Sequence, residues 1–502
     1  MVKRFNPDKR RRPKVDDYFG DWKWREGLAE TMVPLVGKLY RNEVNVLMYG
    51  RPLLNCSAVE IMKLHRFVRE VEGNELSEIE TFPVLEHISK MKLLPCEIDL
   101  GEIVSYLLEN EKLDPLKYVE KLLSENIRTK RSYPLRPKDI VLFGFGRIGR
   151  ILTRLLIADT GGGAKWRLRA IVVRGSGNPD DLIKRASLLR HDSVHGEFAG
   201  TIRVNKENHS LIVNGNEVFV IPSNDPSKID YKKFGIKKAT IVDNTGIWRD
   251  EEGLKQHLKN PSVEKVILTA PAKGKIKNIV YGINDEKAKP EEKILAAASC
   301  TTNAIAPVLK LVDDNFKIVN GHIETVHAYT NDQNLIDNYH SSDRRGRSAA
   351  LNLVITDTGA AKAVSEVLPD LKGKLTANAI RVPTPNVSLA ILNLTLKRGV
   401  GVEELNDCFR KAAFRSKLRE TIDYTNSLDA VSSDFYSNEF AVVYDSQATI
   451  SNFNSVTITL SAPPWVKVGI IKNTFFIIAI YVHVSLIQLI LTIPLRKHDQ
   501  IK

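Results

Sequence analysis

The chain has 502 residues, of which 43% are hydrophobic and 26% are charged, and its formal net charge is +13 at pH 7. The length predicts more than one domain with buried cores, and the scattered cysteines (Cys56, Cys96, Cys300 and Cys408) argue against a secreted, cross-linked fold and for a reducing compartment. The positive charge suits anionic substrates, nucleic acid or an acidic membrane surface, and does not choose among them.

Residues 1–15 form a basic N-terminal tail. Residues 1–14 hold a single acid, Asp8, against seven positive side chains: Lys3, Arg4, Lys9, Arg10, Arg11, Arg12 and Lys14. A nucleic-acid or targeting patch is one interpretation; a solvated, disordered tail is favoured because no aromatic residue is interleaved within the basic run from Lys9 to Lys14. No apolar stretch follows the charges, so we expect no secretory signal and a cytoplasmic protein, and we do not favour nucleic acid or membrane as partners.

Residues 16–130 are predicted to form a helical module. Apolar residues recur there at steps of three and four: Leu28, Met32, Leu35, Val36 and Leu39, then Ile61, Leu64, Phe67 and Val68. No chemical constellation accompanies them, so a helical cap or an oligomerisation module is expected, with regulation as the alternative. Pro134 and Pro137 mark residues 131–137 as a linker.

A dinucleotide-binding turn is predicted next. The apolar run 139–143 enters a turn in which Gly144, Gly146 and Gly149 are spaced as Gly-x-Gly-x-x-Gly, and a helix and a second strand at 168–173 follow. Gly144 permits the tight turn, Gly146 lets the backbone approach a pyrophosphate, and Gly149 allows close helix–sheet packing. The helix then offers the unpaired N–H groups of its first residues, Arg147 and Ile148, to the phosphates.

The end of the second strand bears on cofactor choice. An NAD-specific site places an acid there to bind the ribose 2′-hydroxyl, whereas this strand ends in Arg174. A guanidinium can pair with a 2′-phosphate, so we expect NADP to be accepted, alongside NAD or in its place. The alternative is that Arg174 points to solvent. Further strand-like runs at 239–243 and 265–269 alternate with helices, which predicts a doubly wound parallel sheet.

Cys300 is the candidate nucleophile. It lies between Ser299 and Thr301 and directly precedes a helix-like stretch, whose N-terminus stabilises a thiolate. His327 lies on the next predicted strand. A dinucleotide fingerprint, a thiol and an imidazole in this order describe an enzyme that oxidises an aldehyde through a covalent thioester. The alternative, a buried structural cysteine, is disfavoured by the flanking polar residues.

Six motifs follow one another along the chain, at residues 143–150, 298–303, 325–330, 344–347, 358–364 and 381–388. In these motifs and their order, over residues 138 to about 455, the chain resembles the phosphorylating glyceraldehyde-3-phosphate dehydrogenases. The insert 331–337 and the N-terminal extension resemble longer variants of that family.

The resemblance implies a fold and an activity. It implies an α/β protein with a Rossmann-type, doubly wound NAD(P) domain over residues 138–299 and an α+β catalytic domain over residues 300–460, assembled as a homotetramer. It implies oxidation of glyceraldehyde 3-phosphate with NAD or NADP through a thioester on Cys300, which inorganic phosphate then cleaves. His327 would act as base for hydride loss and as acid toward the leaving group. Thr245 and Thr269 resemble the family's loops beside the nicotinamide and ribose, and no metal is implied.

The resemblance also implies two anion sites. It places the substrate phosphate near Thr330 and Arg381. It places the attacking inorganic phosphate near hydroxyls, a backbone amide and a guanidinium, which are usual phosphate ligands: Ser299, Thr301, Thr358, Gly359 and Arg347. Only one arginine of residues 344–347 need be functional, and the family pattern favours Arg347. Erythrose 4-phosphate is the nearest alternative substrate, because the same sites would serve both sugars.

Residues 461–502 depart from the family pattern. Pro463 and Pro464 stand near the place where a Trp-Tyr-Asp-Asn-Glu run is expected, and residues 474–495 carry no charge if His483 is neutral. That segment is long enough to span a bilayer. A membrane anchor, a tail from an altered reading frame or splice form (the favoured interpretation) and a divergent replacement helix are the alternatives. Because the missing run orients the nicotinamide, activity is in question, and an inactive relative that binds RNA or membranes is the rival function.

Overall fold

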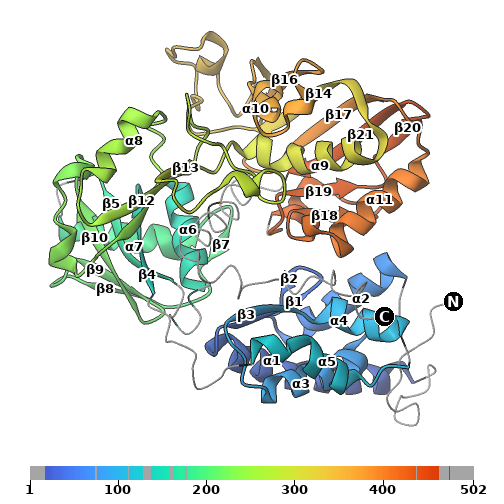
Figure 1. The fold of residues 1–502 in the computed structure, drawn as a ribbon. Coiled ribbons are helices and arrows are strands. Elements are labelled where there is room, and N and C mark those ends of the chain that lie inside the picture. Colours follow the sequence, from blue (N-terminus) through green and yellow to red (C-terminus); the bar gives the residue numbers. More distant parts are fainter. Residues whose placement is uncertain are drawn as a thin grey trace. The chain divides into compact units, whose positions relative to one another are not determined.

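The computed structural model describes residues 17–462 apart from 74–75, 111, 128–136, 159, 161–162, 164–165, 176–177 and 437, together with Thr474. The basic tail, most of the linker and nearly all of the apolar C-terminal segment lie outside the described residues. The chain divides into two compact units, one mostly before Pro137 and one that begins there. The first is blue in Figure 1 and the second runs from teal to red.

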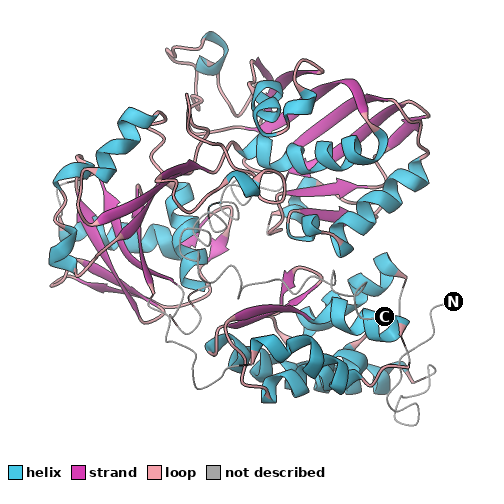
Figure 2. Cartoon of the chain, viewed as in Figure 1, coloured by secondary structure: helices cyan, strands magenta, loops and turns pink. Residues whose placement is uncertain are grey.

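The described part of the N-terminal unit contains five helices and a small sheet (Figure 2). The helices are α1 (Tyr18–Arg41), α2 (Ala58–Glu72), α3 (Glu78–Lys90), α4 (Leu100–Glu109) and α5 (Pro115–Leu123), and the strands are β1 (Val44–Met48), β2 (Arg51–Pro52) and β3 (Cys96–Asp99). Strand β1 pairs antiparallel with β2 and parallel with β3. The helices agree with the expected helical module. The hydrophobic periodicity did not indicate the sheet, because its strands are only five, two and four residues long.

Side-chain caps begin the helices of this unit. Ser57 accepts a hydrogen bond from the backbone N–H of Glu60, and the Glu60 carboxylate accepts one from the backbone N–H of Ser57 at 2.7 Å. Ser77 and Glu80 form the same kind of capping box at the start of α3. Each such cap stabilises a helix by about 1 kcal/mol.

The second unit begins with an eight-stranded sheet in the order β13-β12-β11-β4-β5-β10-β9-β8. Its strands are β4 (Lys138–Phe143), β5 (Trp166–Val173), β8 (Ile202–Asn205), β9 (Ser210–Val213), β10 (Asn216–Pro222), β11 (Ala239–Asp243), β12 (Val263–Leu268) and β13 (Ile294–Ala296). The run from β13 to β10 is parallel, and β9 and β8 are antiparallel additions. The strand order reverses between β4 and β11, which is where a doubly wound sheet binds its ligand. The predicted Rossmann-type fold is confirmed.

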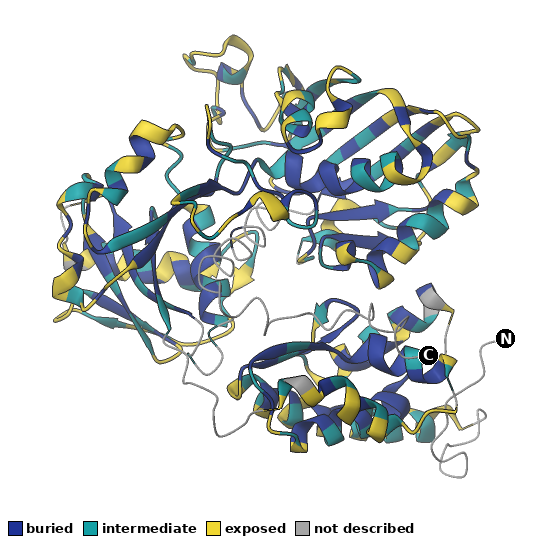
Figure 3. Cartoon of the chain, in the orientation of Figure 1, coloured by how far each residue is buried: buried dark blue, intermediate teal, exposed yellow. Residues whose placement is uncertain are grey.

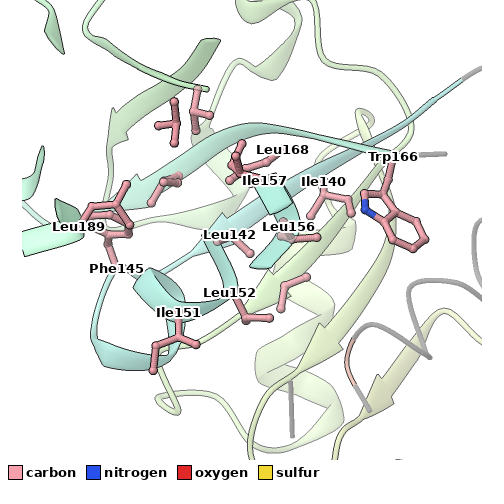
Figure 4. Close-up of a cluster of buried hydrophobic side chains, with 14 of the residues drawn as sticks. Ile140, Leu142, Phe145, Ile151, Leu152, Leu156, Ile157, Trp166, Leu168 and Leu189 are labelled. Atoms are coloured by element: carbon pink, nitrogen blue, oxygen red, sulfur yellow. The ribbon is translucent and has the colours of Figure 1, made fainter. Parts of the chain in front are cut away.

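Helices α6 (Arg147–Ala158), α7 (Pro179–Arg190) and α8 (Glu251–Leu258) accompany this sheet, and β6 (His191–Asp192) and β7 (Gly196–Glu197) form a separate small hairpin. The apolar face of α6 packs on the sheet: Leu152 and Leu156 lie in one buried cluster with Ile140, Leu142 and Leu168 (Figure 4). Burying a side chain of this size contributes about 1.5–3 kcal/mol. This packing fixes the start of α6, and therefore the glycine turn before it.

The catalytic domain has a mixed sheet in the order β15-β16-β14-β17-β21-β19-β18, with β20 paired to β21. Its strands are β14 (Ile318–Ala328), β15 (Val354–Thr356), β16 (Leu375–Val382), β17 (Ser388–Leu396), β18 (Ile422–Thr425), β19 (Val442–Asp445), β20 (Ile450–Asn452) and β21 (Ser455–Ala462), and its helices are α9 (Cys300–Phe316), α10 (Ala360–Val367) and α11 (Val402–Arg415). Residues 302–309 of α9 are all buried (Figure 3). The domain therefore anchors α9 in its core and holds its first residue in a fixed position.

Among the described residues, no helix combines the length and the apolar character needed to cross a membrane. The candidate span at 474–495 lies outside the described residues apart from Thr474, so its interpretation stays a prediction.

Candidate active site

The glycine turn between β4 and α6 has the geometry of a phosphate cradle. Gly144 has φ +103°, a conformation that favours glycine, and its backbone N–H donates to the carbonyl of Val172 at 2.9 Å. A Cβ atom on Gly149 would lie 2.3 Å from the carbonyl oxygen of Gly144, so only glycine fits there. A Cβ atom on Gly146 would meet nothing within 4 Å. Arg147 and Ile148 are the first residues of α6, whose N-terminal N–H groups favour an anion.

A cavity of about 700 Å³ opens beside this turn. It is lined by Gly144 and Gly146, by Arg174 at the end of β5, and by Thr245 in the loop after β11. These are the carboxyl ends of parallel strands, where dinucleotides bind in this fold. The described lining residues include no acid. Open space at Gly146, a cradle at Gly149 and a cavity of this size fit NAD or NADP.

Asp243, which the sequence reasoning missed, fixes the two loops beside this cavity. One of its carboxylate oxygens accepts from the backbone N–H and the hydroxyl of Thr245 at 2.8 and 2.7 Å, and the other lies 3.0 Å from Nε2 of His257. Its backbone carbonyl accepts from the N–H and the hydroxyl of Thr269, each at 3.0 Å. Thr245 lines the cavity, whereas Thr269 is buried behind it. The sequence signal was an acid at the end of an otherwise apolar strand.

Replacing Gly149 with alanine should destabilise the fold, because the new methyl group meets backbone. We expect the free energy of unfolding to fall by about 1–3 kcal/mol, measured by denaturant titration. Gly146→Ala is the matched control: its methyl enters open space, so stability should change by less than about 0.5 kcal/mol while NAD(P) affinity falls. Equal stability losses in both variants would contradict this account of the turn.

Cys300 is the first residue of α9. The preceding residue, Ser299, caps the helix by accepting a hydrogen bond from the backbone N–H of Thr302 at 3.0 Å. The Cys300 side chain is partly exposed, and its sulfur lies 4.0 Å from the hydroxyl of Thr301. Ala298, which precedes Ser299, has φ +56°, an uncommon conformation for a residue with a Cβ atom. The helix N-terminus favours negative charge on the sulfur.

His327 and Arg381 face each other on neighbouring strands. They are register partners in β14 and β16, and Nη1 of Arg381 lies 2.8 Å from Nδ1 of His327 and donates to the carbonyl of Ala328 at 3.0 Å. Burial, and then the positive charge of Arg381, lower the pKa of His327 to about 4. The imidazole is therefore neutral at physiological pH, and because its Nδ1 accepts from Arg381, its proton sits on Nε2.

A thiolate at Cys300 would act on this pair. Burial lowers the pKa of the Arg381 guanidinium, while the negative charges of Asp332 and Cys300 act in the opposite direction. Cys300, Arg381 and His327 therefore belong to one electrostatic environment. This connects the nucleophile at the start of α9 with the base on β14.

Asp332 and Arg345 complete the cluster, and the sequence reasoning had assigned no role to either. Arg345 donates from Nη1 to the Asp332 carboxylate at 2.9 Å and from Nη2 to the hydroxyl of Thr356 at 3.2 Å. The hydroxyl of Thr330 also donates to Asp332. Burial opposes ionisation of Asp332, but the Thr330 hydrogen bond and the charges of Arg345 and Arg381 outweigh it and lower its pKa. Thr330 and Arg381, the predicted substrate-phosphate residues, thus lie in one charged network.

The residues predicted for inorganic phosphate divide into two groups. Ser299 and Thr301 lie at the start of α9, and Thr358 and Gly359 directly precede α10, which packs against α9. Both groups are at helix N-termini, where anions are favoured. Arg347 instead forms an exposed ion pair with Asp337 at 2.7 Å. Its predicted role stays a prediction, while Arg345 makes the polar contacts inside the cluster.

The two arginines can be separated by substitution. We expect Arg345→Gln to lower kcat/KM by about ten- to a hundredfold, because it removes the ion pair of Asp332 beside the predicted anion site. Arg347→Gln removes an exposed ion pair, which is worth about 0–1 kcal/mol, so its effect should stay within about fivefold. Steady-state rates at varied inorganic phosphate measure both. A larger effect at Arg347 would favour the choice made from the sequence pattern.

Comparison with known proteins covers both domains of the second unit. Residues 138–251 match the family model described as glyceraldehyde 3-phosphate dehydrogenase, NAD binding domain, and residues 299–462 match the model of the C-terminal domain. A glyceraldehyde-3-phosphate dehydrogenase of Zymomonas mobilis is 37% identical over 62% of this chain and 88% of its own length. Chloroplastic glyceraldehyde-3-phosphate dehydrogenase B of Pisum sativum is 41% identical over 62% of this chain and 67% of its own.

A longer match reaches the N-terminal unit. A glyceraldehyde-3-phosphate dehydrogenase-like protein of Pseudomonas aeruginosa is 54% identical over 431 residues, which is 85% of this chain and 93% of that protein. Residues 137–502 are too few to account for this match, so it extends into the N-terminal unit. At least part of that unit is therefore shared with a relative of similar length.

Proposed function

Because the chain belongs to the glyceraldehyde-3-phosphate dehydrogenase family, we propose that it oxidises glyceraldehyde 3-phosphate to 1,3-bisphosphoglycerate with inorganic phosphate. It is an oxidoreductase that uses NAD or NADP. One observation carries the proposal: Cys300 begins α9, where the helix N-terminus favours a thiolate, and Nη1 of Arg381 lies 2.8 Å from Nδ1 of the base His327. A reactive thiol, a neutral imidazole and an anion-binding guanidinium are the groups that this reaction needs.

In the proposed reaction, Cys300 is the nucleophile. Its thiolate adds to the aldehyde carbon while the carbonyl oxygen takes up a proton from solvent. His327 then takes the proton from the resulting hydroxyl as the C–H bond breaks, and releases it to solvent before the next turnover. When bound, the nicotinamide supplies the acceptor for the hydride. A phosphate oxygen then attacks the thioester carbon and the sulfur leaves as thiolate, which returns Cys300 to its starting state.

The substrate phosphate also prepares the base in this proposal. While Arg381 donates to Nδ1 of His327, the imidazole proton occupies Nε2. A phosphate that pairs with Arg381 would release Nδ1, which can then donate to the carbonyl of Ala328, 3.0 Å away. That change leaves Nε2 free to accept a proton. It favours phosphorylated aldehydes over uncharged ones.

We propose a homo-oligomer as well. The segment 335–355 exposes a group of large apolar side chains: Leu335, Ile336, Tyr339, Leu351, Leu353 and Ile355. Exposed apolar groups of this kind mark interaction surfaces, and a second copy of the chain is the proposed partner. Sedimentation velocity of the full chain should give a multiple of the monomer mass. A Leu351→Asp variant should shift the distribution toward smaller species, and a wild-type monomer would contradict the proposal.

The function is tested by following reduced-nicotinamide absorbance with the purified full-length protein. Glyceraldehyde 3-phosphate should support turnover with NAD or NADP that depends on inorganic phosphate. Erythrose 4-phosphate, assayed in parallel, tests the nearest alternative substrate, since a higher kcat/KM for it would replace the proposed one. Folded protein that binds cofactor but turns over neither sugar would contradict the proposal and favour an inactive, binding relative.

A further inference from the structure

We propose that Arg185 is a second determinant of cofactor specificity, and that with Arg174 it forms a two-guanidinium site for the 2′-phosphate of NADP. Both side chains line the cavity beside the glycine turn, Arg174 from the end of β5 and Arg185 from the middle of α7. The inference rests on the cofactor pocket that the proposed function requires, but not on the chemistry at Cys300.

The Arg185 side chain contacts the backbone of the residue that follows β5. Nη2 of Arg185 donates to the backbone carbonyl of Arg174 at 2.9 Å, which ties α7 to the end of β5. Gly175 follows with φ +141°, and a Cβ atom there would lie 3.4 Å from the Asp181 carboxylate and 3.7 Å from Nη2 of Arg185. The φ of Gly175 favours glycine, and this residue lies in van der Waals range of the Asp181–Arg185 pair.

The Arg185 guanidinium is held in place before any ligand binds. Its Nε donates to the Asp181 carboxylate at 2.8 Å, one helical turn away, and its side chain is only 19% exposed. These two bonds use two of its five N–H donors, which leaves the others for a ligand in the cavity. Pre-orientation lowers the entropy that a phosphate must offset on binding.

The charge of the residues that line this part of the cavity favours a phosphate. Arg174 is exposed and, among the described residues, makes no side-chain ion pair or hydrogen bond, so its guanidinium is available. Asp181 neutralises part of the Arg185 charge but does not line the cavity. The lining therefore presents two guanidiniums and no carboxylate to a group that carries about −1.5 to −2 charges.

Two neutral polar residues that come after β10 lie at the same cavity. Ser223 and Asn224 follow that strand and line the same cavity, and the backbone N–H of Ser223 donates to the carbonyl of Val173 at 2.9 Å. This bond holds the end of β10 against the end of β5. NAD has no 2′-phosphate for the two guanidiniums to bind, so its affinity should depend little on either arginine.

The test is calorimetric titration of the full chain with NADP, NAD, 2′,5′-ADP and 5′-AMP. The two nucleotide fragments differ only in the 2′-phosphate and do not reach the catalytic centre. We expect 2′,5′-ADP to bind at least about tenfold more tightly than 5′-AMP, and Arg185→Gln and Arg174→Gln each to remove about tenfold of NADP affinity. NAD affinity should change by less than about threefold in both variants. Lys184→Gln, which removes one exposed charge from the same helix, should change neither affinity.

Two results would overturn the site. One is equal binding of the two fragments; the other is an Arg185→Gln variant that loses NAD and NADP affinity equally, which would indicate a structural role. The proposed function fails separately. Tight binding of 2′,5′-ADP without turnover would support the 2′-phosphate site and contradict the proposed enzyme activity. Turnover with NAD alone would support the activity and contradict the site.

Discussion

Cys300→Ser is expected to lower phosphate-dependent NAD(P) reduction by at least about a thousandfold while leaving cofactor affinity unchanged. A hydroxyl at the start of α9 stays protonated and cannot replace a thiolate as nucleophile, and loss of a nucleophile in comparable enzymes costs factors of this size or more. The helix begins at Cys300 and its cap, Ser299, does not use the sulfur, so the fold should persist. Initial rates and calorimetric titration with NAD(P) measure the two effects.

Cys408 provides the matched control. It lies on α11, and burial, followed by the charge of Asp407, raises the pKa of its thiol to about 11. We therefore expect Cys408→Ser to retain activity, and iodoacetamide at neutral pH to modify Cys300 first. A wild-type rate in Cys300→Ser, or preferential labelling of Cys408, would reject Cys300 as the nucleophile.

His327→Gln is expected to lower kcat by about a hundred- to ten-thousandfold, the usual contribution of a positioned general base. The pH dependence gives a sharper test. Because burial and Arg381 lower the pKa of His327 to about 4, the base is neutral above that pH, and its acid limb in kcat/KM should lie near pH 4. Removing the charge in Arg381→Gln makes protonation easier, so the limb should move toward higher pH.

Arg347→Gln serves as the control for this shift. It removes the same charge from an exposed pair with Asp337, and Arg347 is not among the charges that act on His327. The two pH profiles should therefore differ. The same lowered pKa affects stability: between pH 6.5 and 4 the unfolded chain takes up the proton first, so this histidine destabilises the fold as pH falls. An unshifted limb in Arg381→Gln would contradict the assigned coupling.

Local features of this protein were predictable from the sequence. The strand–glycine–helix pattern identified the dinucleotide turn, because Gly144 has a positive φ and a Cβ atom on Gly149 would meet the carbonyl of Gly144 in the same turn. The start of α9 at Cys300 was predictable for the same reason, since Ser299 caps it from one residue away. In both cases the residues that make the determining contacts are close together in the sequence.

Contacts between distant segments were not predictable in this way. His327 meets Arg381 because β14 and β16 pair in one particular register, across 54 residues of sequence. The ion pair of Arg345 and Asp332 depends on how the loop after β14 folds back. The pattern of apolar and polar residues does not predict the path of this loop. The pattern of residues 344–347 favoured Arg347, which forms an exposed ion pair with Asp337, and this choice stays a prediction. The place of Arg185 beside the cavity was not predicted because it depends on how α7 packs in the folded chain.

The hydrogen bonds of Asp243 distinguish two parts of the cofactor pocket: one in which substitutions should disturb the structure, and one in which they should not. Since one buried residue holds both Thr245 and Thr269, substitutions in either loop disturb the other, and natural variation there should be rare. The corner formed by Arg174 and Arg185 uses no bond to Asp243. Evolution, or an engineer, can therefore exchange one nicotinamide coenzyme for the other at that corner without rebuilding the cradle that binds the pyrophosphate.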